Sequence, residues 1–217
     1  MGIRRTIRSA WIKLYRWAAN RLYNEFAWIY DLVSWLVSAG HWDGWRKAAL
    51  AYVSGKRVLE VGFGTGELFL EMATRGWRVC GLDCSPAMHR ITARKLRQRA
   101  LTAPRVRGVT QTLPFADGSF DTLIATFPAE YIVAPETLRE AARVLVADGR
   151  FVIGGLTAQV EYPLLRWLVR PIYGDVLDGL LTYFERVAAE AGFRASVEVE
   201  PAKWVRMPAG VLHKDAG

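Results

Sequence analysis

A glycine-rich turn between an apolar run and a helix constrains this chain more than any other feature. Residues 58–66 read Val-Leu-Glu-Val-Gly-Phe-Gly-Thr-Gly, which is typical of a buried parallel strand that turns directly into a helix. A second apolar run ends in Asp83. Glycine permits a positive φ and has no Cβ, so the backbone can approach a ligand closely. Neighbouring parallel strands end at one sheet edge, where a carboxylate can bind two ribose hydroxyls. The sequence therefore predicts a nucleoside site.

The spacing of the glycines argues against a dinucleotide. A dinucleotide fingerprint is Gly-x-Gly-x-x-Gly, and its third small residue would fall at Glu67. A carboxylate beside a pyrophosphate would be repulsive. The pattern here is Glu60-x-Gly62-x-Gly64-x-Gly66, which resembles the first motif of the class I S-adenosylmethionine-dependent methyltransferases.

Further stretches are similar to ubiquinone and menaquinone biosynthesis methyltransferases, and the likeness runs from about residue 26 to 155. Residues 113–121, Leu-Pro-Phe-Ala-Asp-Gly-Ser-Phe-Asp, resemble the link of those enzymes into the fourth strand, and residues 139–151 resemble their turn into the fifth. The similar lead-in residues are Phe26, Tyr30, Asp31, Leu32, Ser38, Gly40, Trp45 and Arg46. These motifs are specific to the superfamily and much less specific to any substrate.

The resemblance implies S-adenosylmethionine as cofactor and S-adenosylhomocysteine as product. The glycine backbone would pass along the cofactor, helix N-terminal amides could meet its carboxylate, and Glu60 would orient the loop or pair with the cofactor ammonium. The residues expected to bind the cofactor are Glu60, Gly62, Phe63, Gly64, Thr65, Gly66, Asp83, Cys84, Met88, Thr110, Gln111, Thr126 and Phe127. The alternatives are a purely structural turn, an Asp83 that caps the turn at Ser85-Pro86, and plain packing of Cys84, Met88 and Phe127.

Two positions depart from the family pattern. The likeness places an Asp or Asn for the adenine amino group where this chain has Val109, so adenine would be held otherwise, by Thr110 or Gln111. Residues 126–131, Thr-Phe-Pro-Ala-Glu-Tyr, replace the Phe-Gly-Leu-Arg-Asn type of segment of the quinone enzymes. The acceptor is therefore left open within hydrophobic small molecules.

Methyl transfer needs no signature nucleophile in the protein. The sulfonium donor is already activated, so the protein contributes positioning, desolvation and, for a protonated acceptor, a base. The candidates for that base are Tyr30, His41, Glu130 and Tyr131, and the sequence does not choose among them.

Composition favours one globular domain. The chain has 217 residues, 52% of them hydrophobic and 23% charged, which suits an ordinary core. Its two cysteines, Cys80 and Cys84, and its three histidines are too few for a metal site, so none is expected. Reduced thiols fit a cytoplasmic protein.

The basic charge is concentrated at the start. The first fifty residues hold eight Lys or Arg against three acidic residues, and apolar residues recur at helical spacing over residues 3–20. This helix could lie on the inner membrane surface or pack over its own domain. No stretch is long enough to cross a bilayer, and the basic residues exclude a secretory signal.

Alternating apolar runs and helical patterns predict an α/β fold with a Rossmann-like, doubly wound sheet. Expected strands cover residues 56–61, 77–83, 105–109, 120–127, 151–156, 195–199 and 204–212. Expected helices cover residues 3–20, 22–38, 42–53, 67–75, a stretch opening at 85–86, 135–146 and 180–191. The short link at residues 200–203 makes the last two strands antiparallel, and the resemblance implies the order 3-2-1-4-5-7-6.

One domain with additions is the expected organisation. Residues 1–53 form a helical cap, residues 54–217 form the cofactor-binding domain, and an apolar insert at about 157–176 roofs an acceptor pocket together with the cap.

The leading interpretation is methyl transfer to a small hydrophobic acceptor. The sequence pI of about 9.8 keeps an RNA methyltransferase as an alternative, although residues 126–131 lack the Asn/Asp-Pro-Pro-Tyr type of motif. A non-catalytic module that binds S-adenosylmethionine is the alternative from another class, and a nicotinamide dehydrogenase is a distant third.

Overall fold

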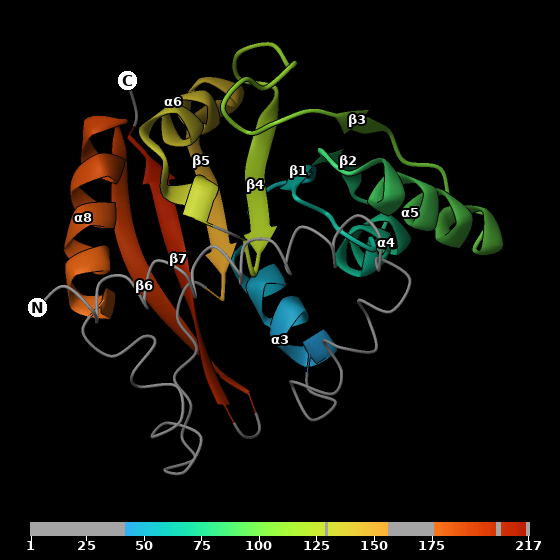
Figure 1. Cartoon of the computed structure of the whole chain (residues 1–217), viewed down its shortest axis with the longest axis horizontal. Coiled ribbons are helices and arrows are strands. Elements are labelled where there is room, and N and C mark those ends of the chain that lie inside the picture. The colour runs from blue at the N-terminus through green and yellow to red at the C-terminus, as the bar shows by residue number, and fades with distance from the viewer. Residues whose placement is uncertain (1–41, 129, 156–175, 203–204, 216–217) are drawn as a thin grey trace, which may run out of the picture.

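Seven strands form one sheet in the computed structural model, which describes residues 42–128, 130–155, 176–202 and 205–215. Their order is β3-β2-β1-β4-β5-β7-β6, as Figure 1 shows. The strands are β1 (Arg57–Val61), β2 (Arg78–Asp83), β3 (Arg105–Arg107), β4 (Phe120–Thr126), β5 (Leu145–Gly154), β6 (Phe193–Ala202) and β7 (Val205–Lys214). The first five pair in parallel, and β7 runs antiparallel between β5 and β6. The predicted fold class and strand order are confirmed.

Helices cover both faces of the sheet, and Figure 1 shows α4 and α5 beside β1 to β3, with α6 and α8 on the other side. The helices are α3 (Trp42–Ala48), η2 (Ala49–Tyr52), α4 (Glu67–Thr74), α5 (Pro86–Gln98), η3 (Glu130–Val133), α6 (Pro135–Val144) and α8 (Val176–Glu190), of which η2 and η3 are 3-10 turns. The helix expected over residues 42–53 is thus an α-helix followed by a 3-10 turn. The helices expected at residues 3–20 and 22–38, and the insert through residue 175, lie outside the described residues.

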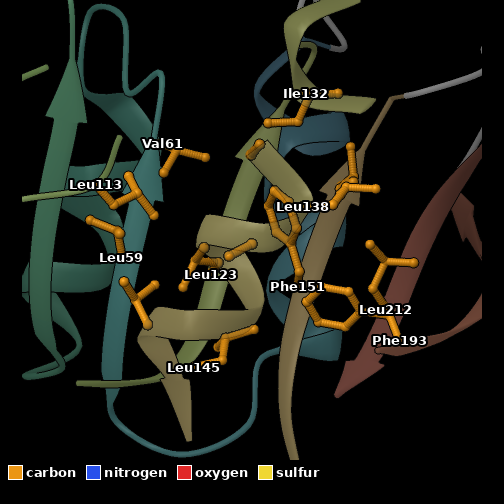
Figure 2. Packing of buried hydrophobic residues seen from close by; sticks show 14 of the residues in the cluster. Leu59, Val61, Leu113, Leu123, Ile132, Leu138, Leu145, Phe151, Phe193 and Leu212 are labelled. Carbon is orange, nitrogen blue, oxygen red and sulfur yellow. The ribbon is translucent and has the colours of Figure 1, made fainter. Parts of the chain in front are cut away.

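The core has two parts because successive strand side chains point to opposite faces. Val58 of β1 packs with Phe69 and Met72 of α4. Its neighbour Leu59 packs on the other face with Leu138 of α6 and Phe184 of α8, and Figure 2 shows this second cluster between the sheet and its helices. The sheet is therefore buried on both sides, as a parallel sheet requires.

Strand β1 lies where the order of the sheet reverses. Its neighbours are β2 and β4, so the segments that follow β1 and β4 leave the sheet in different directions. Such a switch point opens a crevice at the carboxyl ends of the strands. Helix α5 begins at the same edge with Ser85 as its N-cap, whose Oγ accepts a hydrogen bond from the Met88 amide at 3.4 Å, and Pro86 follows as predicted.

The largest difference from the expected elements concerns α6 and β5. The helix ends at Val144 instead of 146, and β5 already begins at Leu145. Leu145 is fully buried and pairs with Phe120, so burial and pairing outweigh the turn signal at Asp148, whose φ of 58° lies inside the strand. A register shift next to Phe120 accommodates the irregularity.

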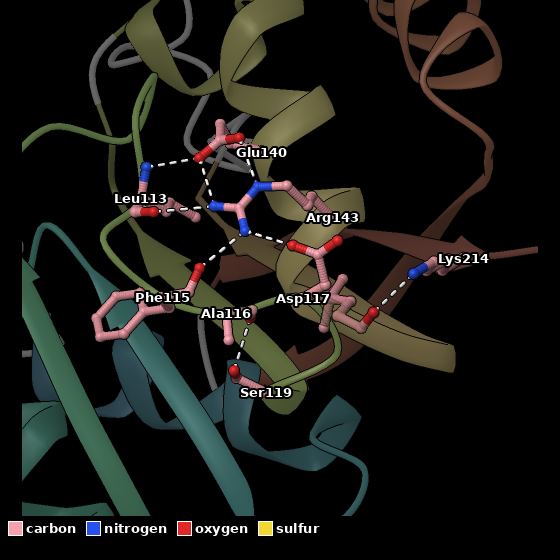
Figure 3. A network of polar contacts seen from close by, with 9 residues as sticks. Leu113, Phe115, Ala116, Asp117, Ser119, Glu140, Arg143 and Lys214 are labelled. Carbon is pink, nitrogen blue, oxygen red and sulfur yellow. Dashed lines mark hydrogen bonds and ion pairs between the residues drawn. The ribbon is translucent and has the colours of Figure 1, made fainter.

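Arg143 of α6 holds the segment that leads into β4 (Figure 3). It donates to the carbonyls of Leu113 at 2.9 Å and Phe115 at 2.8 Å, and it pairs with Asp117 at 2.7 Å and Glu140 at 2.8 Å. Glu140 also accepts from the Leu113 amide at 2.7 Å. This network fixes the amino end of β4, opposite the crevice.

Across the described ranges, no helix is both long and apolar enough to cross a membrane.

Candidate cofactor and acceptor site

A cavity of about 340 Å³ lies at the carboxyl edge of the sheet. Every residue expected to bind the cofactor lies on its wall except Gly66 and Met88. The sequence analysis did not assign to the site seven other lining residues: Arg46, Leu68, Leu82, Ser85, Gly108, Val109 and Pro128. Of these, Arg46 could have been predicted from the sequence, because it belongs to the lead-in that resembles the quinone enzymes.

Two glycines of the loop after β1 are required by their conformation and their neighbours. Gly62 has a φ of 71°, and a Cβ there would lie 2.7 Å from the hydroxyl of Tyr131. Gly66 has a φ of 82°, and its Cβ would lie 2.5 Å from Thr92 of α5. The absence of a Cβ therefore lets the Tyr131 hydroxyl approach the backbone at Gly62 and lets the loop pack against α5 at Gly66.

Asp83 joins the loop after β1 to the start of α5 through two hydrogen bonds. Its Oδ2 accepts from the Gly64 amide at 2.9 Å and its Oδ1 accepts from the Ser85 amide at 2.8 Å. Burial raises the pKa of this carboxyl, against the backbone amides of Ser85 and Gly64 and the charge of His89, which lower it. The turn-capping contact is thus present, and the remaining lone pairs of the carboxylate can accept from ribose hydroxyls.

Glu60 and Arg46 are opposite charges on one wall of the cavity with atoms left unpaired. Glu60 is 2% exposed, and within the described ranges its Oε2 has no hydrogen-bond partner. The Nε of Arg46 is likewise buried without a partner there, and Arg46 reaches Asp43 only at 3.5 Å. Burial raises the pKa of Glu60 well above its usual range, although the charge of Arg46 opposes this. Unpaired buried charges are costly, and a zwitterionic amino-acid group would pair with both.

Glu67 faces away from the cavity. Its carboxylate pairs with Lys95 at 2.6 Å and lies 3.7 Å from Arg99, both on α5. Glu67, the acid that argued against a dinucleotide site in the sequence, therefore joins α4 to α5 through ion pairs.

Phe63 and Met88 contribute mainly to the core. The Phe63 ring lies 5.7 Å from that of Phe69 and 4.8 Å from that of His89, and it fills the space that a Cβ at Gly81 would need. Met88 is fully buried in the same cluster, whereas Cys84 is exposed and lies on the cavity wall. Among the described residues, no group of side chains could hold a metal ion.

The segment after β3 carries the residues that the sequence analysis expected to contact adenine. The Gly108 amide donates to the Asp83 carbonyl at 3.2 Å, which places the segment beside the nucleoside end. Val109 is 51% exposed and lies on the wall with Thr110 and Gln111. Thr110 is buried, and its Oγ1 lies 3.1 Å from that of Thr137.

The segment at and after the end of β4 also lines the cavity, through Thr126, Phe127, Pro128 and Tyr131. Phe127 has a φ of 49°, a left-handed conformation that costs a residue with a Cβ about 1 kcal/mol or more. Its amide donates to the Gly154 carbonyl at 2.8 Å, and its ring occupies the space beside Gly155, where a Cβ would be 2.5 Å away. Strain of this kind concentrates at functional sites.

Tyr131 is the candidate base whose side chain the structure describes. Tyr131 lines the cavity, and its hydroxyl lies against Gly62. Glu130 begins η3, and its side chain is not among those described. Tyr30 and His41 lie outside the described residues, as does the basic segment 3–20.

Comparison with known proteins agrees with this geometry. A family model described as a methyltransferase domain matches residues 59–153. The demethylmenaquinone methyltransferase of Deinococcus radiodurans is 33% identical over 204 residues, covering 90% of this chain and 78% of that protein. The enzyme of the same name from Thermus thermophilus is 35% identical over 138 residues, and the match covers 61% of this chain and 63% of the Thermus protein. The chain therefore spans less than two thirds of the length of that relative.

Solved structures show the same fold. A structure of SAM-dependent methyltransferases from Methanosarcina mazei superposes with a TM-score of 0.60 at 17% identity, covering 77% of this chain and 97% of that one. The fold, the site and the relatives together place this chain in the class I S-adenosylmethionine-dependent methyltransferases. The residues present fit the cofactor of that family, because the glycine loop, Asp83, Glu60 and Arg46 line one cavity, and Glu60 and Arg46 each keep a polar atom without a partner among the described residues.

Proposed function

We propose that this protein transfers the methyl group of S-adenosylmethionine to a small hydrophobic acceptor with a quinone-type ring. The observation that carries the proposal is the composition of the cavity. The segments of β1 and β2 and the loop after β1 present the glycines and the acids Glu60 and Asp83, and the segment after β4 presents Phe127, Pro128 and Tyr131. A polar nucleoside and an apolar acceptor would thus meet in one space. The names of the quinone-methylating relatives support the choice of ring.

The reaction requires little covalent chemistry from the protein. Bound S-adenosylmethionine supplies an activated methyl group: its bond to sulfur breaks as the bond to the acceptor forms, S-adenosylhomocysteine is released, and the acceptor loses a proton. Glu60 and Arg46 hold the charged amino-acid end, and Asp83 holds the sugar. The protein thereby fixes the donor geometry, which is the main source of rate in such a displacement.

The wall after β4 positions the acceptor. Phe127 and Pro128 exclude water and provide apolar contact, and the Tyr131 hydroxyl is the candidate acid-base group placed on the cavity wall. A phenolic group can orient an acceptor hydroxyl and exchange its proton. The segment that carries these residues differs from that of the quinone enzymes, so the ring class is proposed and its substituents are left to experiment.

The test combines binding with label transfer. Calorimetry should show S-adenosylhomocysteine binding at one site. The protein is then incubated with S-adenosylmethionine labelled in the methyl group and with separate bacterial lipid, metabolite and RNA fractions, the lipid fraction in detergent with a reductant. We expect label in the lipid fraction, and in a reduced demethylmenaquinone supplied alone.

The other outcomes discriminate the alternative functions. Label in RNA with a steep salt dependence would replace the proposal by nucleic-acid methylation. Binding of S-adenosylhomocysteine without label in any fraction would identify a non-catalytic module. A Tyr131→Phe variant that keeps the full rate would remove the hydroxyl from the reaction.

A further inference from the structure

The wall that continues from Asp83 must meet the base of a bound nucleoside. Asp83 pairs in register with Arg107 at the end of β3, and the Gly108 amide donates to the Asp83 carbonyl. Residues 108–111 therefore extend the cavity wall directly from the acid that faces the sugar. A base attached to that sugar has this segment as its neighbour.

An adenine base brings a 6-amino donor, which the side chain of Val109 cannot accept. The Val109 carbonyl already accepts from the Thr112 amide at 3.3 Å. Val109 is apolar and half exposed. The remaining side chains that segment 108–111 places on the wall are Thr110 and Gln111. Thr110 is only 4% exposed. The carboxamide of Gln111 is therefore the side-chain group of this segment that can present either a donor or an acceptor to the base.

A count of hydroxyl protons fixes which atom of the Gln111 carboxamide meets Thr110. Thr137 Oγ1 donates its single proton to the Tyr131 carbonyl at 2.8 Å. Thr110 Oγ1, at 3.1 Å from Thr137 Oγ1, must then donate to it. The proton of Thr110 is spent in that bond, so Thr110 Oγ1 can only accept from Gln111.

Only the Nε2 of a carboxamide can donate to Thr110. The structure places Gln111 Oε1 at 3.4 Å from Thr110 Oγ1, a long contact for two oxygens when the Thr110 proton is engaged elsewhere. A half turn of the carboxamide exchanges its oxygen and nitrogen with almost no change in shape. It completes a directed chain from Gln111 through Thr110 and Thr137 to the Tyr131 carbonyl. Oε1 of Gln111, a residue that lines the cavity, then points away from Thr110.

We propose that Gln111 recognises adenine through Oε1, which accepts a hydrogen bond from the 6-amino group, and that Thr110 and Thr137 hold the carboxamide in this orientation. Gln111 is then a specificity-determining residue that replaces an acid at position 109. The inference rests on the proposed function, because the nucleoside is that of S-adenosylmethionine.

The experiment compares two ligands that differ only at the base. S-adenosylhomocysteine carries a 6-amino donor, and its deaminated analogue with a hypoxanthine base carries a 6-oxo acceptor and an N1 donor. Calorimetry on the full chain should show about tenfold tighter binding of the adenine ligand, the scale of one mismatched buried hydrogen bond. Gln111→Leu should lose most of this discrimination by weakening the adenine ligand about tenfold and the analogue little.

Two further variants separate recognition from simple structural damage. Gln111→Glu keeps an acceptor and should preserve the preference for adenine. Thr110→Val removes the hydroxyl that orients the carboxamide, so Gln111 can turn its amide towards the 6-oxo group and the discrimination should shrink several-fold. Thr112→Val is the matched control, since Thr112 is exposed and should change neither affinity.

The outcomes are distinguishable from failure of the proposed function. Equal weakening of both ligands by Gln111→Leu, or unchanged discrimination in Thr110→Val and Gln111→Leu together, would overturn the inference while leaving methyl transfer intact. A wild-type protein that binds neither ligand would instead refute the proposed function.

Discussion

Two arginines lie at opposite ends of the sheet and differ in how fully their donors are hydrogen-bonded. Arg143, at the amino end of β4, contacts two carbonyls and two carboxylates (Figure 3). Arg46, on the cavity wall, has a buried Nε with no partner in the described chain. A guanidinium whose donors are all engaged within the fold stabilises the fold, whereas a buried donor without a partner beside a cavity indicates a ligand. The difference separates structural from functional polar residues.

Replacement of each arginine by methionine tests that comparison most directly. Arg143→Met should lower the free energy of unfolding by about 2–3 kcal/mol, because the Leu113 and Phe115 carbonyls and Glu140 lose a charged donor. Arg46→Met should change it by less than about 1 kcal/mol without ligand and weaken S-adenosylhomocysteine binding about tenfold. Denaturant unfolding and calorimetry measure both quantities. Equal destabilisation by the two variants would end the distinction.

Asp83 is intermediate, since it is paired within the fold and also lines the cavity. Asp83→Ala should weaken S-adenosylhomocysteine binding by roughly 1–3 kcal/mol, the cost of a buried hydrogen-bond partner left unmade. Asp121 is the matched control at the other edge, where it accepts from the amides of Lys56 and Arg57 at 3.0 and 2.9 Å. Asp121→Ala should lower stability and leave affinity unchanged. Calorimetric affinity equal to wild type in Asp83→Ala would remove Asp83 from the site.

Glu60 should make the ligand-free protein less stable as pH rises. Its folded-state pKa lies above the ordinary value of 4.5, so the folded state holds its proton more tightly than the unfolded state does. The resulting stability is present below about pH 4.5 and is lost as pH rises through the folded-state pKa. Glu60→Gln should flatten this dependence and make the ligand-free protein more stable at neutral pH, as denaturant unfolding at several pH values would measure.

Ligand binding gives a second measurement on Glu60. A bound ammonium favours the ionised carboxylate, so S-adenosylhomocysteine should release a proton from wild type and none from Glu60→Gln. Calorimetry in buffers of different ionisation enthalpy measures that proton. An identical proton count for the two proteins would show that Glu60 is ionised before binding.

Phe127 should yield the smallest effect. In Phe127→Gly the relief of the left-handed backbone offsets the loss of ring packing, so stability should stay within about 1 kcal/mol of wild type. The KM for a hydrophobic acceptor should rise about fivefold with cofactor affinity unchanged. Asp148→Gly relieves the same kind of backbone at an exposed position within β5 and should not alter KM. A loss of cofactor affinity in Phe127→Gly would contradict its place on the acceptor wall.

Local patterns made most of the fold predictable. The apolar run that forms β1, the glycines after it and the Ser85-Pro86 start of α5 each depend on a few adjacent residues, so the sequence alone locates them. The strand order came from family resemblance, because spacing does not determine which strands pair. The early start of β5 was missed, since pairing of Leu145 with Phe120 depends on contacts distant in sequence.

The site was predictable where it follows the glycine motif and not elsewhere. Asp83 and Glu60 are recognisable from their positions after apolar runs. Arg46 reaches the cavity from α3 through tertiary packing, which sequence periodicity does not report. Met88 was expected on the wall, but as the third residue of α5 its side chain turns into the core, where it is fully buried.

The position of the cavity between the segments after β1 and β4 has a consequence for how acceptor preference can change. In the proposed function, Arg46 and the lining residues between 60 and 111 hold the donor, and the short stretch 126–131 meets the acceptor. Substitutions in that stretch can therefore diversify the molecule that receives the methyl group while the machinery that presents it is inherited intact.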